Sequence, residues 1–231
     1  MSETAAAASA PSPTAEAAGT PLDALIATVA QLRGPGGCPW DAEQTHASLV
    51  QYLVEETHEL VDAIEAGGRE EMIEELGDVL YQVILHSDIA EHTEGEAFTV
   101  QDVAATLNAK LIGRHPHVFG DVVAETSEDV VAFWDDLKAA EKPERTSVLD
   151  GIPQGMPSLG LADKLLGKAT KLGLIDSDPD AGIPFGSEDE LGSMLLAIVA
   201  SAKARGLDAE RALRSTLRDF QAEIREAEGA E

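Results

Sequence analysis

The sequence predicts an all-α protein. Only 4% of its 231 residues are aromatic, whereas Ala, Leu and Glu recur throughout, a balance that favours helices over the β-branched and aromatic strands of a sandwich or barrel. Apolar residues repeat at three- and four-residue intervals along several segments, which is typical of helices with one buried face. A hydrophobic content of 44% can supply a core for one large domain or two small ones.

The first residues predict a disordered tail followed by a helix. Residues 1–20 are rich in Ala, Ser, Pro and Thr, and they lack the basic start and long apolar stretch of a secretory signal. No apolar run in the chain approaches the ~20 residues of a membrane span. Helical spacing begins at Pro21 and stops at Gly34, with apolar residues at Leu22, Leu25, Ile26, Val29 and Leu32.

Two further helices are predicted on either side of the Gly67–Gly68 pair. The first would start at Asp41, because Gln44 three residues later suggests a capping box, and would run through Ile64. The second follows the glycines, and its apolar residues keep the alternating spacing of a strongly amphipathic helix: Met72, Ile73, Leu76, Val79, Leu80, Val83 and Ile84.

The rest of the chain predicts another helix pair, a linker and a smaller second half. Thr99 and Asp102 suggest a capping box that opens a helix ending near Gly113, and a short helix follows from Ser127. Prolines and glycines then mark 143–158 as a linker. We therefore expect one helical domain over 21–142 and a second unit over 159–231.

The charge balance bears on partners and location. A formal net charge of -27 argues against nucleic acid and anionic membranes as partners, because both require a basic surface. The single cysteine, Cys38, cannot form an internal disulfide, and a reducing cytoplasm fits that composition. A polyanionic substrate would need metal ions to bind to such a chain.

Four carboxylates are arranged symmetrically about Gly67. Glu59 and Glu75 lie eight residues on either side of it, and Glu56 and Asp78 lie eleven on either side. If the glycines fold the two helices into an antiparallel hairpin, each pair is level along the axis, at ~12 and ~16 Å from the turn. The i,i+3 spacing within each helix places both acids of that helix on one face.

Such a cluster predicts a divalent-metal site. Carboxylates brought together repel one another unless a hard cation neutralises them, and oxygen ligands favour Mg²⁺ or Mn²⁺ over zinc. Acidic pairs also arise by chance on solvated helix faces in a chain with 43 acidic residues. Solvated faces usually include Lys or Arg, however, and neither 53–65 nor 70–88 contains one. Glu55 lies next to the cluster and could orient a water molecule.

Three sequence runs resemble the MazG family of nucleoside triphosphate pyrophosphohydrolases. They occur in the family's order and spacing, and they read GGCPWDAEQTHASLVQYLVEETHELVDAI, EELGDVLYQVILHS and KLIGRHPHVFG. The resemblance is close from Leu22 to about Lys142 and looser in the second half. It implies an all-α homodimer that uses Mg²⁺ to cleave nucleoside triphosphates into a nucleoside monophosphate and pyrophosphate, as expected for nucleotide-pool housekeeping.

The resemblance also implies residue roles. The family's metal ligands fall on Glu56, Glu59, Glu75 and Asp78. Lys110 and Arg114 would hold phosphates, and Trp134 with Lys138 would contact the nucleotide. Glu55 or a hydroxide on the metal would activate the attacking water.

The second half predicts a shortened and degenerate repeat without a site of its own. Glu190, Leu191 and Gly192 parallel Glu75, Leu76 and Gly77 at a spacing of 115 residues, but Ser193 replaces Asp78. Ser187 and Glu190 suggest a capping box that explains this glutamate without metal. Two alternatives stay open for the whole chain: a phosphoribosyl-ATP or dUTP-type pyrophosphohydrolase, and a non-catalytic helical regulatory module stabilised by metal.

Overall fold

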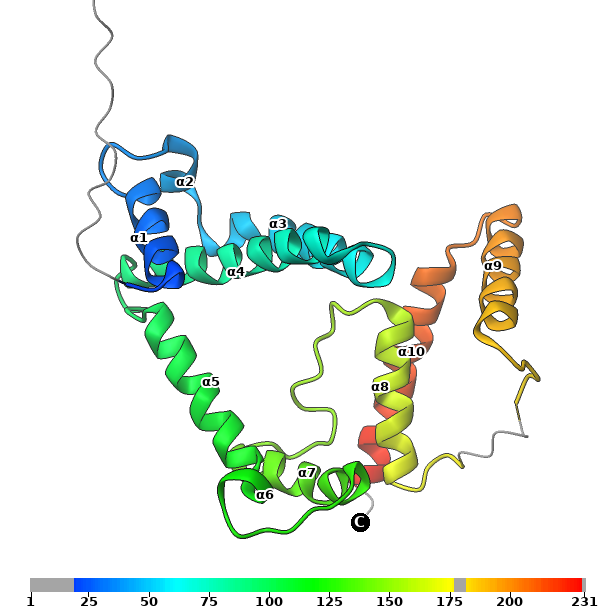
Figure 1. Ribbon diagram of the computed structural model, residues 1–231. Helices are drawn as coiled ribbons and strands as arrows, with labels where there is room; N and C mark the ends of the chain where they lie inside the picture. Colours follow the sequence, from blue (N-terminus) through cyan, green and yellow to red (C-terminus); the bar gives the residue numbers. More distant parts are fainter. Residues whose placement is uncertain (1–18, 177–181, 230–231) are drawn as a thin grey trace, which may run out of the picture. The chain divides into compact units, whose positions relative to one another are not determined.

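A computed structural model describes residues 19–176 and 182–229, apart from the side chains of Ala132, Asp135, Asp136 and Ala139. Every regular element in these ranges is a helix, as the sequence predicts (Figure 1). The chain forms two compact units, of which the first ends at Val123 and the second begins at Ala124. The predicted tail lies almost entirely in residues 1–18, outside the described part, whereas Gly19 and Thr20 lead directly into the first helix.

The first unit opens with the helices α1 (Pro21–Arg33) and α2 (Pro39–Glu43). Thr20 and Asp23 form a reciprocal capping box at the start of α1, with the Thr20 amide donating to Asp23 Oδ2 at 2.7 Å. The predicted capping box of Asp41 and Gln44 is wrong. Asp41 lies inside α2, whose first turn accommodates Pro39, and Gln44 adopts the extended backbone that ends it.

The helices α3 (His46–Glu65) and α4 (Arg69–Glu91) form a hairpin and lie side by side (Figure 1). Thr45 caps α3 in a box with Ser48, four residues later than the sequence predicted. Only residues 66–68 connect the two helices. A Cβ on Gly67 would lie 2.7 Å from the Ala63 carbonyl oxygen, so only glycine fits this tight connection.

The core of the first unit lies at one end of this hairpin. Val29 of α1 packs there with Leu49 of α3 and with three residues from the last turns of α4, namely Ile84, Leu85 and Ile89. Each of these side chains contributes about 1.5–3 kcal/mol by leaving water. The first half of α4 differs from its amphipathic prediction, because Ile73 and Leu76 remain 54% and 51% exposed.

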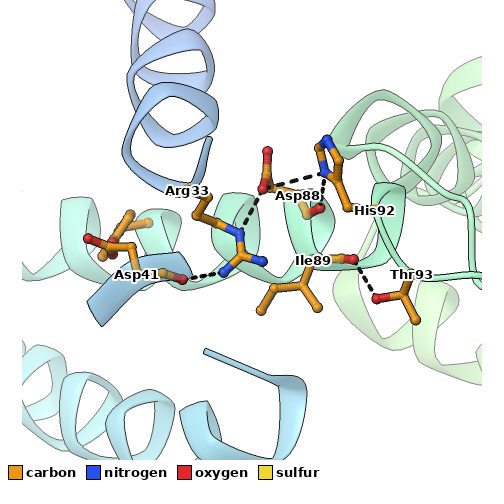
Figure 2. A network of polar contacts seen from close by, with 7 residues as sticks. Arg33, Asp41, Asp88, Ile89, His92 and Thr93 are labelled. Carbon is orange, nitrogen blue, oxygen red and sulfur yellow. Dashed lines mark hydrogen bonds and ion pairs between the residues drawn. The ribbon is translucent and has the colours of Figure 1, made fainter. Parts of the chain in front are cut away.

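A polar network joins α1, α2 and α4 beside this core (Figure 2). Arg33 Nε donates to Asp88 Oδ2 at 2.7 Å, and the same guanidinium donates to the Asp41 carbonyl oxygen. The Tyr81 hydroxyl donates to Asp41 Oδ1 at 2.5 Å, and burial followed by this hydrogen bond raises the Tyr81 pKa. Because Arg33 and Asp88 are both nearly buried, each charge depends on the other.

A second polar contact connects the start of α3 with the end of α4. His46 Nδ1 lies 2.7 Å from His86 Nδ1, and His46 Nε2 lies 2.8 Å from Glu96 Oε2. Burial, reinforced by His46, lowers the pKa of His86. His86 is therefore more strongly held in its neutral form than an exposed histidine.

The first unit continues with α5 (Val100–Arg114) and the short α6 (Pro116–Phe119). The predicted capping box of Thr99 and Asp102 is confirmed, since the Thr99 amide donates to Asp102 Oδ2 at 2.9 Å and the Asp102 amide donates back to the Thr99 hydroxyl. No residue of α5 is buried. Its apolar residues Val103, Leu107 and Leu111 lie on one face, and all three are exposed.

The second unit contains α7 (Ser127–Glu141), α8 (Ser158–Lys171), α9 (Glu188–Ala204) and α10 (Ala209–Glu228). Its core forms where α8 packs against α10, from the side chains of Leu149, Leu161, Leu165, Ala169, Leu217 and Ile224. Because Leu149 belongs to this core, the predicted linker 143–158 is an ordered part of the second unit. The predicted repeat boundaries themselves stay a prediction.

Acidic side chains of the second unit hold backbone and hydroxyl donors. Glu210 accepts from the Ser158 hydroxyl at 2.6 Å and from its amide at 3.2 Å, which satisfies the start of α8. Glu228 accepts from the Ser147 hydroxyl and from the Val148 amide, at 2.7 and 2.6 Å. Glu190 accepts from the Gly186 amide at 2.7 Å, and its own amide donates to Ser187 Oγ. These acids serve the fold.

Candidate metal centre

The α3–α4 hairpin brings together acidic side chains from both helices. Glu56 of α3 and the pair Glu75 and Asp78 of α4 each offer a carboxylate oxygen, and these three oxygens all lie within 4.8 Å of one another. Within the described ranges, this is the one group of at least three Asp, Glu, His or Cys residues whose ligand atoms lie this close together. A single oxygen-ligated cation could contact all three.

The Glu75 carboxylate supplies an independent observation. Its Oε2 atom is buried and has no hydrogen-bond partner. A buried polar atom without a partner is costly, and a carboxylate oxygen in that position is satisfied by a cation. The donor set contains oxygen alone, so these residues fit a hard divalent ion of the Mg²⁺ type.

Burial and mutual repulsion raise two carboxylate pKa values at this site. Burial raises the pKa of Glu56, and the nearby Asp78 and Glu59 add to the rise. Burial also raises the pKa of Glu75, and Glu59 and then Asp78 add to it. Each carboxylate is therefore harder to ionise than usual, and a cation would reverse that cost by pairing with the charged form.

The remaining predicted acids lie beside this group. Glu59 does not belong to the set of three, yet its charge raises the pKa values of both Glu56 and Glu75. Glu55 also raises the pKa of Glu56, although it is exposed on α3. The structure thus assembles three of the four predicted ligands, with Glu59 and Glu55 close enough to act on their charge.

The predicted phosphate-binding residues lie on another helix of the same unit. Lys110 and Arg114 occupy the last two turns of α5. Val100, in the first turn of α5, packs against the core at the end of the hairpin. From there α5 runs away from α3 and α4 (Figure 1). Within one chain, Lys110 and Arg114 therefore do not join the three carboxylates.

The predicted nucleotide contacts lie in the second unit. Trp134 is half-buried on α7, and Lys138 is exposed one turn later. Lys138 lines a cavity with five further basic residues, namely Lys142, Arg145, Lys164, Lys168 and Lys171.

Sequence reasoning missed that cavity and the buried Arg33–Asp88 pair. The i,i+4 spacing of Lys164 and Lys168 was a visible signal for the first, because it places both on one face of α8. The second had no local signal, since 55 residues separate its members.

In the described part of the chain, no helix combines the length and apolar character needed to cross a membrane.

Comparisons with known proteins agree on one family. Residues 44–119 match the model of the MazG nucleotide pyrophosphohydrolase domain. An uncharacterised 26.1 kDa protein of Streptomyces cacaoi is 50% identical over 83% of this chain and 77% of its own length. The nucleoside triphosphate pyrophosphohydrolase/pyrophosphatase MazG of Thermotoga maritima is 40% identical over 88% of this chain and 84% of its own length.

A third relative extends the agreement. The nucleoside triphosphate pyrophosphohydrolase of Escherichia coli K12 is 34% identical over 90% of this chain and 87% of its own length. The matched family domain contains all three residues of the carboxylate group, and the relatives cover both units. The chain therefore belongs to the MazG nucleotide pyrophosphohydrolase family.

Proposed function

We propose that this protein hydrolyses nucleoside triphosphates to nucleoside monophosphate and pyrophosphate, with Mg²⁺ or Mn²⁺ held by Glu56, Glu75 and Asp78 and completed by Glu59. The observation that carries the proposal is the carboxylate group itself, with oxygens within 4.8 Å of one another and a buried, unpartnered Glu75 Oε2. Family membership supplies the reaction type, because relatives named as pyrophosphohydrolases cover most of the chain.

The ion would supply positive charge to the phosphate oxygens and lower the pKa of a water molecule. The protein's own contribution is to hold four acids on two helices that a three-residue connection keeps in register. Glu55 projects from the helical turn that carries Glu56, and we assign it the task of accepting a proton from the attacking water.

The positively charged groups needed by the substrate lie outside the hairpin. We assign Lys110 and Arg114 to the phosphates, and Trp134 with Lys138 to the nucleotide. Because α5 leads Lys110 and Arg114 away from the acids of its own chain, a second protomer is the simplest source of these groups for each site.

Exposed apolar residues support a homodimer. α5 contains no buried residue, and Leu107 on it is 49% exposed. On the hairpin, Val50, Val54 and Ile64 of α3 and Ile73 and Leu76 of α4 are at least half exposed. Exposed apolar side chains in this number are typical of a protein that buries them against a partner subunit.

The dimer can be tested by sedimentation velocity. The wild-type protein is expected to sediment as a dimer, and Leu107→Glu to shift it toward monomer. Leu159→Glu, at a 57% exposed position on α8 of the second unit, serves as the matched control. A monomeric wild type would contradict this part of the proposal.

Product analysis tests the reaction. The protein is incubated with Mg²⁺ and each canonical nucleoside triphosphate, several damaged ones, dUTP and phosphoribosyl-ATP, and the products are separated by chromatography. Monophosphate with pyrophosphate supports the proposal, whereas diphosphate with phosphate contradicts it. Turnover of many nucleoside triphosphates supports a housekeeping role in a cytoplasmic nucleotide pool. Turnover confined to dUTP would instead indicate dUTP removal, and turnover confined to phosphoribosyl-ATP would indicate a biosynthetic role.

A silent enzyme would point to a structural role for the metal. If no substrate turns over while Mg²⁺ raises the melting temperature, the site stabilises a regulatory module. Glu75→Gln removes the charge of the buried, unpartnered oxygen. It should abolish the rise in melting temperature with Mg²⁺ whether or not the protein is catalytically active.

A further inference from the structure

The second unit contains a cavity of about 780 Å³ with a strongly basic lining. It lies between α8, the segment that follows α7, and the end of α10. Six of the chain's 16 Lys and Arg residues line it: Lys138, Lys142, Arg145, Lys164, Lys168 and Lys171. In a protein with a formal net charge of -27, such a concentration of cations marks this cavity as distinct from the remaining surface.

One wall of the cavity is a face of α8. Lys164, Lys168 and Lys171 follow i,i+4,i+7 spacing, so they lie one above another on that face. The adjoining face of α8 carries Leu165 and Ala169, which are buried in the core against α10. Since the core fixes the rotation of α8 about its axis, it also fixes the direction in which these lysines project.

The lining also contains the guanidinium group of Arg145. Gly151 has a φ of +82°, and a Cβ added there would collide with the Arg145 guanidinium. The absence of a side chain at Gly151 therefore lets Arg145 lie directly on the backbone of this turn. Because Arg145 also lines the cavity, its guanidinium can donate to an anion bound there.

The two acids that line the cavity are already engaged in holding its wall. Asp150 Oδ2 accepts from the backbone amides of Thr146 and Ser147 at 2.9 and 3.1 Å. Glu228 accepts from the Ser147 hydroxyl and the Val148 amide. They leave an excess of four positive charges in the lining. The hydrogen bonds to Glu228 connect the segment after Arg145 to α10.

We propose that this cavity binds a short oligophosphate anion, either free or as the phosphate tail of a nucleotide. Several closely spaced cations suit a ligand with several negative charges, whereas a single carboxylate would need only one or two of them. The floor contains Val148, Ile152 and Leu172, which could also accept an apolar base or ribose. The cavity lies within the second unit and the carboxylate group within the first, and Lys138 is the one lining residue that the proposed function also uses. The other five cations carry the inference whether or not the first unit hydrolyses nucleotides.

Isothermal titration calorimetry of the full chain in EDTA tests the proposal. Without metal, the four acids of the first unit repel phosphates, so binding depends on the cations of the chain, and variants separate the cavity from Lys110. Inorganic triphosphate, pyrophosphate, phosphate and ATP are titrated separately, at 50 and 300 mM NaCl. The proposed site predicts about one triphosphate per chain, affinity that falls in the order triphosphate, pyrophosphate, phosphate, and weaker binding at the higher salt concentration.

Paired variants locate the binding. The double variant Lys164→Gln, Lys168→Gln should lower the affinity for triphosphate at least about tenfold, since two of the charges are lost. Lys203→Gln, an exposed lysine on α9 that does not line the cavity, should leave it unchanged. Melting temperatures within about 2 °C of wild type would show that both variants are folded.

Each outcome decides the question. ATP binding more tightly than triphosphate identifies a nucleotide tail as the ligand, and equal affinities identify free oligophosphate. The proposal is overturned if wild type binds no triphosphate, if the double variant binds it normally, if Lys110→Gln on α5 abolishes binding, or if a DNA duplex competes at equal phosphate concentration.

Discussion

Both units use acidic side chains to cap helices and turns, but the first also brings acidic side chains together without such donors. In the first, Glu56, Glu75 and Asp78 converge, and Glu75 Oε2 is buried without a partner. In the second, Glu190, Glu210 and Glu228 each accept hydrogen bonds from backbone amides. A carboxylate that receives such donors stabilises a turn or a helix end, whereas carboxylates that face only one another require a cation. Residue type alone does not distinguish these uses, but the donors around each acid do.

Substituting one acid of each kind tests this difference most directly. Glu75→Gln or Asp78→Asn should lower turnover at least about a thousandfold, because the loss of a ligand removes several kcal/mol of charge stabilisation. Glu190→Gln, at the position that the predicted repeat pairs with Glu75, should leave turnover within about twofold of wild type. Steady-state pyrophosphate release with Mg²⁺ measures both. Comparable losses in the two units would mean that the second unit takes part in catalysis.

Ion pairs provide the next largest difference. Arg33→Met should lower the free energy of unfolding by about 3–5 kcal/mol, because Asp88 is left charged and buried. Arg214→Ala removes the exposed pair with Glu210 in the second unit and should cost less than about 1 kcal/mol. Urea denaturation followed by circular dichroism measures both changes. The double variant Arg33→Met, Asp88→Leu should recover part of the loss, and a further loss there would contradict the explanation.

The hydrogen-bonded acids of the second unit should show a smaller effect. Glu210→Ala removes the acceptor of the buried Ser158 hydroxyl and of its amide, and should cost about 1–2 kcal/mol. Glu226→Ala, at an exposed position on the same helix, is the control and should be nearly neutral. Hydrogen exchange of α8 should accelerate in the first variant alone. Unchanged protection there would show that Glu210 does not stabilise the start of α8.

The smallest expected effect is a difference in pH dependence. His86 has a pKa below its ordinary value of 6.5, mainly because of burial, so below pH 6.5 the unfolded chain takes up a proton that the folded chain resists. Stability of the first unit should therefore fall as the pH drops from about 6.5. Asp150 in the second unit has a lowered pKa through hydrogen bonds from Ser147 and Thr146, so its contribution persists until the pH falls below 3.8.

Hydrogen exchange between pH 7.5 and 5.5, corrected for intrinsic rates, can separate the units. Peptides from α3 and α4 should lose protection over this range, and peptides from α8 and α10 should not. His86→Gln should remove this pH dependence of protection. The variant retains His46, which contacts His86, and Glu96, which contacts His46. An identical pH dependence in wild type and variant would rule out His86 as its source.

Much of the first unit could be predicted from sequence because its signals are local. The capping box of Thr99 and Asp102 and the tight turn at Gly67 each depend on residues within a few positions. The register of the hairpin followed from counting residues, and it brought three of the four predicted ligands together. The start of α3 was placed too early because Pro39 begins a short helix of its own, a choice that local capping rules do not resolve.

Long-range features could not be predicted in the same way. The Arg33–Asp88 pair, the exposure of Leu76 and the role of Glu210 all depend on which helices pack together. Helical periodicity predicts that one face of α4 is apolar, but not that only its last turns find a core within the chain.

The three-residue connection between α3 and α4 makes the metal centre sensitive to chain length. If one residue were added in 66–68 and incorporated into the first turn of α4, the residues after it would rotate by about 100° and shift by about 1.5 Å relative to α3. Glu75 and Asp78 would then point away from Glu56, although every side chain of the site would still be present. A single inserted or deleted residue at this turn is therefore expected to disrupt the metal centre as thoroughly as the loss of one of its ligands.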